Sequence, residues 1–183
     1  MKKGLLISVI SILIFAFSFA QDQFTVQIEP FLITNAPSAH SFSWGKTSDG
    51  KWIIIGGRID GLHQRQPFAA FQENDNNKSV SVIDPVANQT WNTTLNVLQS
   101  SIFEQLQSTN QEFYQRDNTL YIMGGYGFSA TQNDHVTHDK LTAIDVDGLA
   151  NAVINDTSVI PFFRQISNTN LVVRGCQLGL LNN

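Results

Sequence analysis

The chain has 183 residues, of which only 14% are charged, and its formal net charge is −4. Globular proteins average about a quarter charged residues. The 11 Lys and Arg form no cluster, which argues against nucleic acid as a partner because phosphate binding needs clustered cations. A single cysteine, Cys176, excludes an internal disulfide.

The first twenty residues predict a secretory signal peptide. Met1–Lys3 is basic, Gly4–Phe19 is apolar and uncharged, and Ser18 and Ala20 are small residues before a cleavage site. The apolar run is shorter than the roughly 20 residues of a membrane helix; the alternative is an uncleaved N-terminal anchor. We therefore expect a secreted, periplasmic or cell-surface protein with no membrane span after cleavage.

Alternating and continuous apolar runs predict strands in the next part of the chain. Phe24–Ile28 and His40–Lys46 alternate with a period of two. A hairpin turn at Ser48–Gly50, favoured by Asp-Gly, leads into Trp52–Ile55, a continuous apolar run whose two faces should both be buried. Leu95–Gln107 has the spacing of a short amphipathic helix, with an outer strand followed by a loop as the alternative.

The same order of elements recurs further along the chain. Gln111–Arg116 is a predicted strand, Asp117–Asn118 is the turn, and Leu120–Met123 is the buried strand. Leu149–Ile154 is expected to form one helical turn. Phe162–Ile166 is then a predicted outer strand.

Paired glycines end both buried strands, at Gly56–Gly57 and Gly124–Gly125. Glycine at such a position permits a bulge or a close approach of two backbones. A second run with an acidic end follows each doublet, at Ser79–Pro85 and Leu141–Asp147. This internal repeat, at about 60 to 70 residues, predicts an architecture of repeated units.

The repeated pattern resembles the Kelch repeat of β-propeller proteins. The first copy carries Ile53–Gly57, Val82–Asp84 and Trp91, and the second carries Tyr121–Gly125 and Ile144–Asp145 but lacks the Trp. The resemblance covers the chain from about residue 36 onward. It implies an all-β fold, a Kelch-type β-propeller present in part, with about two four-stranded blades and the start of a third.

The resemblance also implies a division of the chain. Residues 1–20 are the signal peptide, 21–35 a strand that closes the last blade, 36–110 the first repeat, 111–170 the second, and 171–183 a truncated third with Leu171–Leu181 as its inner strand. Propellers close with about four to eight blades, so we expect the front part of a longer protein. The remaining blades or other copies would cover the open edges. The alternative is a self-contained β-sandwich of about eight strands.

Two long loops follow the glycine doublets, Arg58–Phe71 and Tyr126–Asp139. In a propeller of this kind both emerge on one face, and functional residues concentrate in loops held by a rigid scaffold. The candidate ligand-binding residues are Arg58, Asp60, His63, Arg65, Tyr126, Asp134, His135 and His138.

The chemistry of these loops leaves several readings open. The first loop suits a carboxylate or a sugar, because an Arg fork binds planar anions; the alternative for Arg58 is a structural role on carbonyl groups of the neighbouring blade. His135 and His138 with Asp134 or Asp139 suit a divalent metal, but an irregular loop sets no direction for them. No metal and no cofactor is therefore predicted.

We expect a protein- or glycan-binding module rather than an enzyme, because no GxSxG, P-loop or CxxC pattern is present. The alternative, implied by the resemblance, is a carbohydrate-active enzyme of sialic acid mutarotase or galactose oxidase type. The oxidase needs a Tyr–Cys cross-link. Cys176 lies in a predicted buried strand, which argues against the oxidase. A structural surface protein without a small ligand is the third reading.

Overall fold

The computed structural model describes residues 25–62, 66 and 70–181. The predicted signal peptide and the candidate site residues His63 and Arg65 therefore lie outside the described residues. The chain divides into two compact units, Met1–Leu32 and Ile33–Asn183, and every described strand and helix belongs to the second. No described helix has the length and apolar character to cross a membrane.

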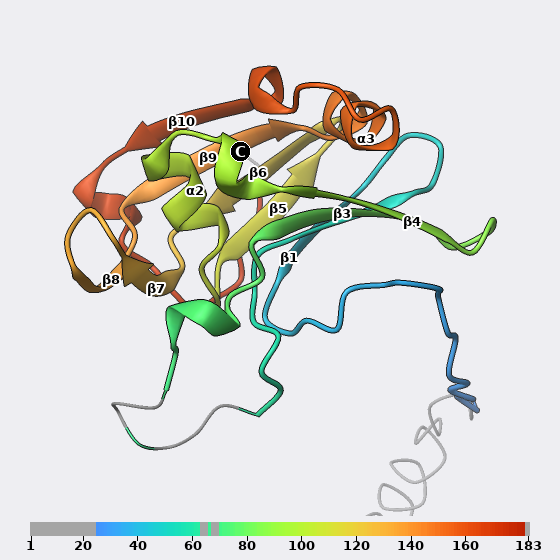
Figure 1. Cartoon of the computed structure of the whole chain (residues 1–183), viewed down its shortest axis with the longest axis horizontal. Coiled ribbons are helices and arrows are strands. Elements are labelled where there is room, and N and C mark those ends of the chain that lie inside the picture. Colours follow the sequence, from blue (N-terminus) through green and yellow to red (C-terminus); the bar gives the residue numbers. More distant parts are fainter. Residues whose placement is uncertain (1–24, 63–65, 67–69, 182–183) are drawn as a thin grey trace, which may run out of the picture. The chain divides into compact units, whose positions relative to one another are not determined.

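The first sheet is an antiparallel meander of consecutive strands (Figure 1). It contains β1 (Ser43–Lys46), β2 (Trp52–Ile55), β3 (Ser79–Asp84) and β4 (Gln89–Thr94). The predicted turn between β1 and β2 is confirmed, with Gly50 at φ +94°, a value that glycine adopts without strain. Ile53 pairs with Val82 and Ile55 with Val80, so the four apolar side chains share one face of the sheet.

The second sheet repeats this plan with one insertion. Its order is β10-β9-β6-β5, and the strands are β5 (Glu112–Arg116), β6 (Thr119–Met123), β9 (Lys140–Asp145) and β10 (Phe163–Ser167). Instead of the irregular loop predicted at Tyr126–Asp139, the chain between β6 and β9 forms a separate hairpin of β7 (Tyr126–Ser129) and β8 (Asp134–Thr137). Each glycine doublet thus follows the second strand of a four-stranded sheet. The described fold is mostly antiparallel sheet, as predicted, and neither sheet closes on itself.

Short helices lie between the strands and after the last one. They are η1 (Glu73–Asp75), η2 (Leu95–Val97), α2 (Ser100–Leu106), α3 (Val146–Ile154), η3 (Ile160–Phe162) and η4 (Thr169–Leu171). The helical reading of Leu95–Gln107 is therefore confirmed, and the expected helical turn at Leu149–Ile154 is a longer helix. It begins earlier because the Asp145 carboxylate accepts a hydrogen bond from the Gly148 N–H at 2.9 Å, the usual N-cap arrangement.

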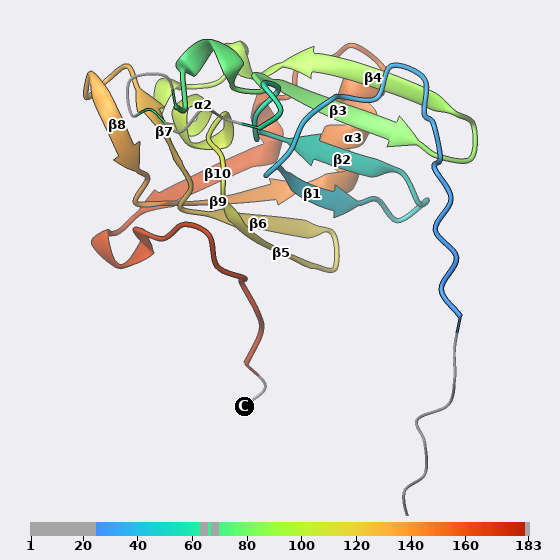
Figure 2. The same ribbon diagram turned by 90° about the horizontal axis from the view of Figure 1, so that it is seen from below.

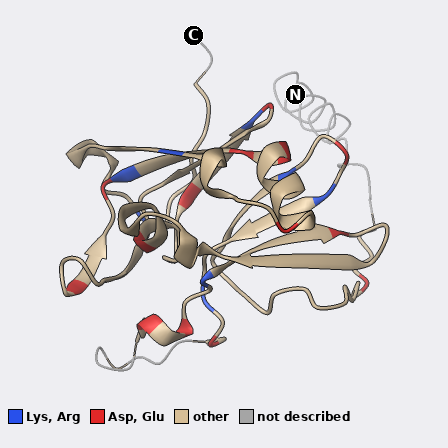
Figure 3. Cartoon of the chain, turned by 45° about the horizontal axis from the view of Figure 1, so that its top comes forward, with Lys and Arg blue, Asp and Glu red and all other residues tan. Residues whose placement is uncertain are grey.

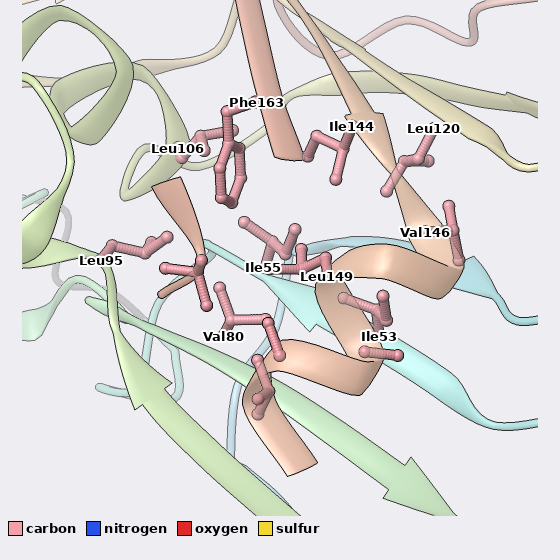
Figure 4. Packing of buried hydrophobic residues seen from close by; sticks show 14 of the residues in the cluster. Ile53, Ile55, Val80, Leu95, Leu106, Leu120, Ile144, Val146, Leu149 and Phe163 are labelled. Atoms are coloured by element: carbon pink, nitrogen blue, oxygen red, sulfur yellow. The ribbon is translucent and has the colours of Figure 1, made fainter. Parts of the chain in front are cut away.

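The hydrophobic core lies between the two sheets. Its side chains come from both sheets and from α3, and they point toward one another (Figure 4). At one edge the strands β1 and β5 are in direct contact: the Gln115 side chain accepts from the Lys46 N–H and donates to the Lys46 carbonyl, both at 2.7 Å. Away from this edge α3 packs against β3, β4 and β9 (Figure 2). The sheets are therefore close at β1 and β5, while a helix fills the space near β4.

Two predicted strands are wrong in their described parts. Residues 25–28 are irregular and exposed, and no described strand pairs with them; an extended segment without a partner strand leaves its backbone groups to water. Residues 172–181 also form no strand. Isolated hydrogen bonds hold this segment, among them one from the Gly125 N–H to the Val173 carbonyl at 3.0 Å. Cys176 is exposed, not buried as the strand prediction required.

An apolar face of the first sheet is open to solvent. Phe42, Trp44, Trp52 and Ile54, with Lys46, line a hollow of about 480 Å³ on the side of the sheet away from the core. Trp44 is 46% exposed and Trp52 38%. The expectation that both faces of Trp52–Ile55 are buried therefore holds for Ile53, Ile54 and Ile55 but not for Trp52.

Candidate functional site

Arg58 begins the loop after the first glycine doublet, and its side chain is 1% exposed. It forms a bidentate pair with Asp60: Nε donates to Oδ1 at 3.0 Å and Nη2 donates to Oδ2 at 2.7 Å. Nη1 donates to the Gln72 carbonyl at 3.2 Å and to Asn76 Oδ1 at 3.1 Å. One cation therefore ties together the start and the end of the loop, in the geometry where Arg pairs most strongly.

The carboxylate of Asp60 is stabilised in its charged form by the same contacts. Hydrogen bonds from Arg58 hold the pKa of Asp60 below its usual value, although burial alone would raise that pKa. His40 Nε2 lies 3.5 Å from Asp60 Oδ1. Arg58 thus has a structural role within its own loop, rather than on carbonyl groups of the neighbouring sheet.

The β7–β8 hairpin brings aromatic side chains to the first loop. Tyr126 and His135 stack at 5.9 Å between ring centroids, and Phe128 meets His135 edge-on at 5.5 Å. Phe71, at the end of the first loop, meets Tyr126 edge-on at 5.2 Å and lies under the Arg58 guanidinium at 5.4 Å. His135 Nε2 is 2.9 Å from the Phe71 carbonyl oxygen, so the Nε2–H tautomer donates to it. We call Phe71, Tyr126, Phe128 and His135 the aromatic cluster.

The C-terminal segment adds a cation to the aromatic cluster. The Arg174 guanidinium lies 4.7 Å above the Tyr126 ring, and its Nη1 donates to the Thr137 hydroxyl at 3.0 Å. Stacking of Arg on an aromatic face is favourable by roughly 0.5 to 2 kcal/mol. Three segments far apart in the chain therefore meet at Tyr126.

A buried carboxylate fastens the hairpin to α2. Glu104, 7% exposed, accepts hydrogen bonds from the Ser129 hydroxyl at 2.6 Å, the Thr131 hydroxyl at 2.7 Å and the Thr131 N–H at 3.0 Å. Burial alone would raise the pKa of Glu104, but these hydrogen bonds together outweigh it, so the pKa lies below its usual value. His138, 6% exposed, lies near this carboxylate, and burial lowers the pKa of His138.

His138 predicts a pH dependence of stability. Its folded-state pKa lies below the usual value near 6.5, although Glu104 and Asp139 raise it and Lys140 lowers it further. As the pH falls, the His138 side chain therefore binds a proton in the unfolded chain before it does so in the folded chain. The free energy of unfolding should fall as the pH drops below about 6.5. In His138→Gln this slope should be absent in urea unfolding curves between about pH 5 and 7; an unchanged slope would contradict the assignment.

The two histidines of the second loop do not face one another. His135 is on β8 and contacts Phe71 and Tyr126, whereas His138, just past the strand, interacts electrostatically with Glu104 of α2. An odd separation along an extended segment puts side chains on opposite faces. Asp134 is exposed, and its carboxylate accepts from the His135 N–H at 2.7 Å. Within residues 25–62, 66 and 70–181, no group of three His, Cys, Asp or Glu is placed to hold a metal.

The structure thus joins part of the predicted site. Arg58, Asp60, Tyr126 and His135 belong to one continuous set of contacts through Phe71, and His138 lies apart. Glu104 and Arg174 were not among the predicted site residues, because each reaches the hairpin only through the fold. Lys and Arg are dispersed over the described residues rather than gathered on one face (Figure 3). Comparison of the chain with known protein-family models and with curated proteins found no match.

Proposed function

We propose that the two sheets are neighbouring blades of a Kelch-type β-propeller, and that the loops after the glycine doublets form a face that binds a protein or a glycan. The observation that carries the binding proposal is the contact between Phe71 and Tyr126. It joins the two loops that the repeat pattern singles out. Aromatic side chains with an adjacent Arg are the groups enriched at recognition surfaces.

Sheet topology supports the blade interpretation over the β-sandwich. The first sheet is a meander of consecutive strands, and the second keeps this order apart from the inserted β7–β8 hairpin, whereas sandwiches commonly connect their two sheets by Greek-key crossings. The bare side of the first sheet, with Trp44 46% exposed, is a second support. A single blade has two apolar faces and needs a neighbour on each. Here the second sheet covers one of them.

A binding experiment on the whole chain tests the proposal. Ligands would be sought on an array of neutral and acidic oligosaccharides and on a panel of extracellular proteins. Tyr126→Ala should weaken the strongest binding by about tenfold or more, because one stacked aromatic contributes at least about 1.4 kcal/mol at a binding hot spot.

Tyr121→Ala is the matched control for that experiment. Tyr121 is also half-buried, but it lines a hollow on the far side of the second sheet, near Leu141. Thermal unfolding of both variants would confirm that they are folded. Loss of binding in Tyr121→Ala with full binding in Tyr126→Ala would overturn the assignment of the face, and so would the absence of any ligand.

A further inference from the structure

A recessed surface lies between α2, the β7–β8 hairpin and η4. It is a groove of about 960 Å³, within the range of small-molecule sites, about 300 to 1,000 Å³. Six of its thirteen lining residues carry a hydroxyl group: Ser100, Ser101, Ser129, Thr131, Thr137 and Thr169. Those of Ser129 and Thr131 donate to Glu104 and that of Thr137 accepts from Arg174, so the hydroxyl groups of Ser100, Ser101 and Thr169 are the ones offered to a ligand. We call it the α2 groove.

The charges of the α2 groove are compensated within the protein. Lys140 pairs with Asp139 at 2.9 Å, and the Ser167 hydroxyl donates to Asp139 while it accepts from Lys140. Glu104 already accepts three hydrogen bonds from Ser129 and Thr131. A charged ligand would therefore find no free counter-ion in the described wall, and an anion would be repelled by Glu104.

One residue that lines the groove has a side-chain nitrogen without a hydrogen-bond partner. The Nε2 atom of His138 is buried and has no partner among the described residues, and the side chain is 6% exposed. A buried polar atom without a partner in a native protein calls for an explanation, such as a ligand or a water that it carries. A hydroxyl group both donates and accepts, so it satisfies either tautomer of the imidazole.

We infer that the α2 groove binds a neutral carbohydrate, held by hydroxyl–hydroxyl hydrogen bonds and by His138. This inference rests on the proposed binding function and names its ligand class. Size, the hydroxyl lining and the absence of a free charge all favour a neutral polyhydroxylated ligand over a charged one. The groove adjoins the aromatic cluster at Thr137, which lines the groove and accepts a hydrogen bond from Arg174, but none of the four residues of the cluster lines the groove.

The test uses the full chain and three neutral trisaccharides, maltotriose, triacetylchitotriose and galactotriose, with sialyllactose as the charged comparison. Binding would be followed by the NMR signals of the His138 ring at sugar concentrations up to about 10 mM. This range covers weak binding with dissociation constants of about 1 mM. At least one neutral trisaccharide should shift these signals. Ser101→Trp, which fills the groove from an exposed position, should weaken that binding at least about tenfold.

Gln89→Trp is the matched control, since Gln89 is exposed on β4 away from the groove, and it should bind like the parent. Three results would overturn the inference: no shift with any neutral trisaccharide, binding of sialyllactose alone, or unchanged affinity in Ser101→Trp. Sugar binding that is lost in Tyr126→Ala but kept in Ser101→Trp would reject the groove and leave the proposed function standing.

Discussion

Gly57→Ala is expected to lower the free energy of unfolding by about 3 kcal/mol or more. Gly57 has φ +81°, where a non-glycine residue costs about 1 to 3 kcal/mol. An added Cβ would also lie 2.3 Å from the His40 carbonyl oxygen and 2.9 Å from the Phe42 nitrogen. His40 cannot easily withdraw, because it exchanges two backbone hydrogen bonds with Arg58, both 2.9 Å long. The clash adds to the cost of the backbone strain, so the expected loss of stability lies in the upper range of values for point mutations.

Gly50→Ala separates backbone strain from the clash. Gly50 has φ +94°, but an added Cβ there would meet nothing within 4 Å. The loss of stability in Gly50→Ala should be close to the cost of the backbone strain alone, about 1 to 2 kcal/mol. Urea unfolding of the parent and both variants measures the difference. Equal losses in Gly57→Ala and Gly50→Ala would contradict the close approach of the two backbones.

Arg58→Ala is expected to destabilise the protein by about 3 to 5 kcal/mol, the range for removing one partner of a buried pair. Asp60, Asn76 and the Gln72 carbonyl would lose their shared donor. Arg58→Lys should recover only part of this loss, because an ammonium group lacks the planar fork. Arg116→Ala is the control: the Arg116 side chain is 64% exposed and its ion pair with Asp117 is 4.0 Å long, so its effect should stay within about 0.5 kcal/mol.

The pH dependence of stability in acid provides a second measurement of the pair between Arg58 and Asp60. The hydrogen bonds from Arg58 lower the folded-state pKa of Asp60 below its usual value of 3.8. The stability from this pair is therefore present above that value and is lost as the pH falls through the folded pKa. In Arg58→Ala the contribution should be missing, so the difference between variant and parent should shrink in that acidic range. A difference in stability that stays constant with pH would show that Arg58 acts through packing rather than through its charge.

Most strands of the two sheets were predictable because their signals are local. Alternating residues, the Asp-Gly turn before Trp52 and the glycine doublets each act within a few residues of the chain. The strands predicted at Phe24–Ile28 and Leu171–Leu181 were wrong in their described parts for a related reason. Their apolar pattern is real, but a strand also needs a partner, and the described chain supplies none.

The candidate site was predictable only as two loops of suitable composition. Arg58 and Tyr126 were found because each follows a doublet, yet their connection through Phe71 depends on how two sheets lie against each other. Glu104 and Arg174 have no signal in their own segments: one is a helix residue, and the other lies in an irregular stretch. Their roles depend on hydrogen bonds and stacking across 25 or more positions of the chain.

Patterns of apolar residues, turns and paired glycines were thus enough to locate most strands of the two sheets, because backbone geometry responds to near neighbours. The packing of the sheets around α3, the burial of Arg58 and the opposite orientations of His135 and His138 came from the folded arrangement alone. Side-chain contacts between distant segments depend on distances that no local pattern encodes, and the aromatic cluster and the α2 groove are both built from such contacts.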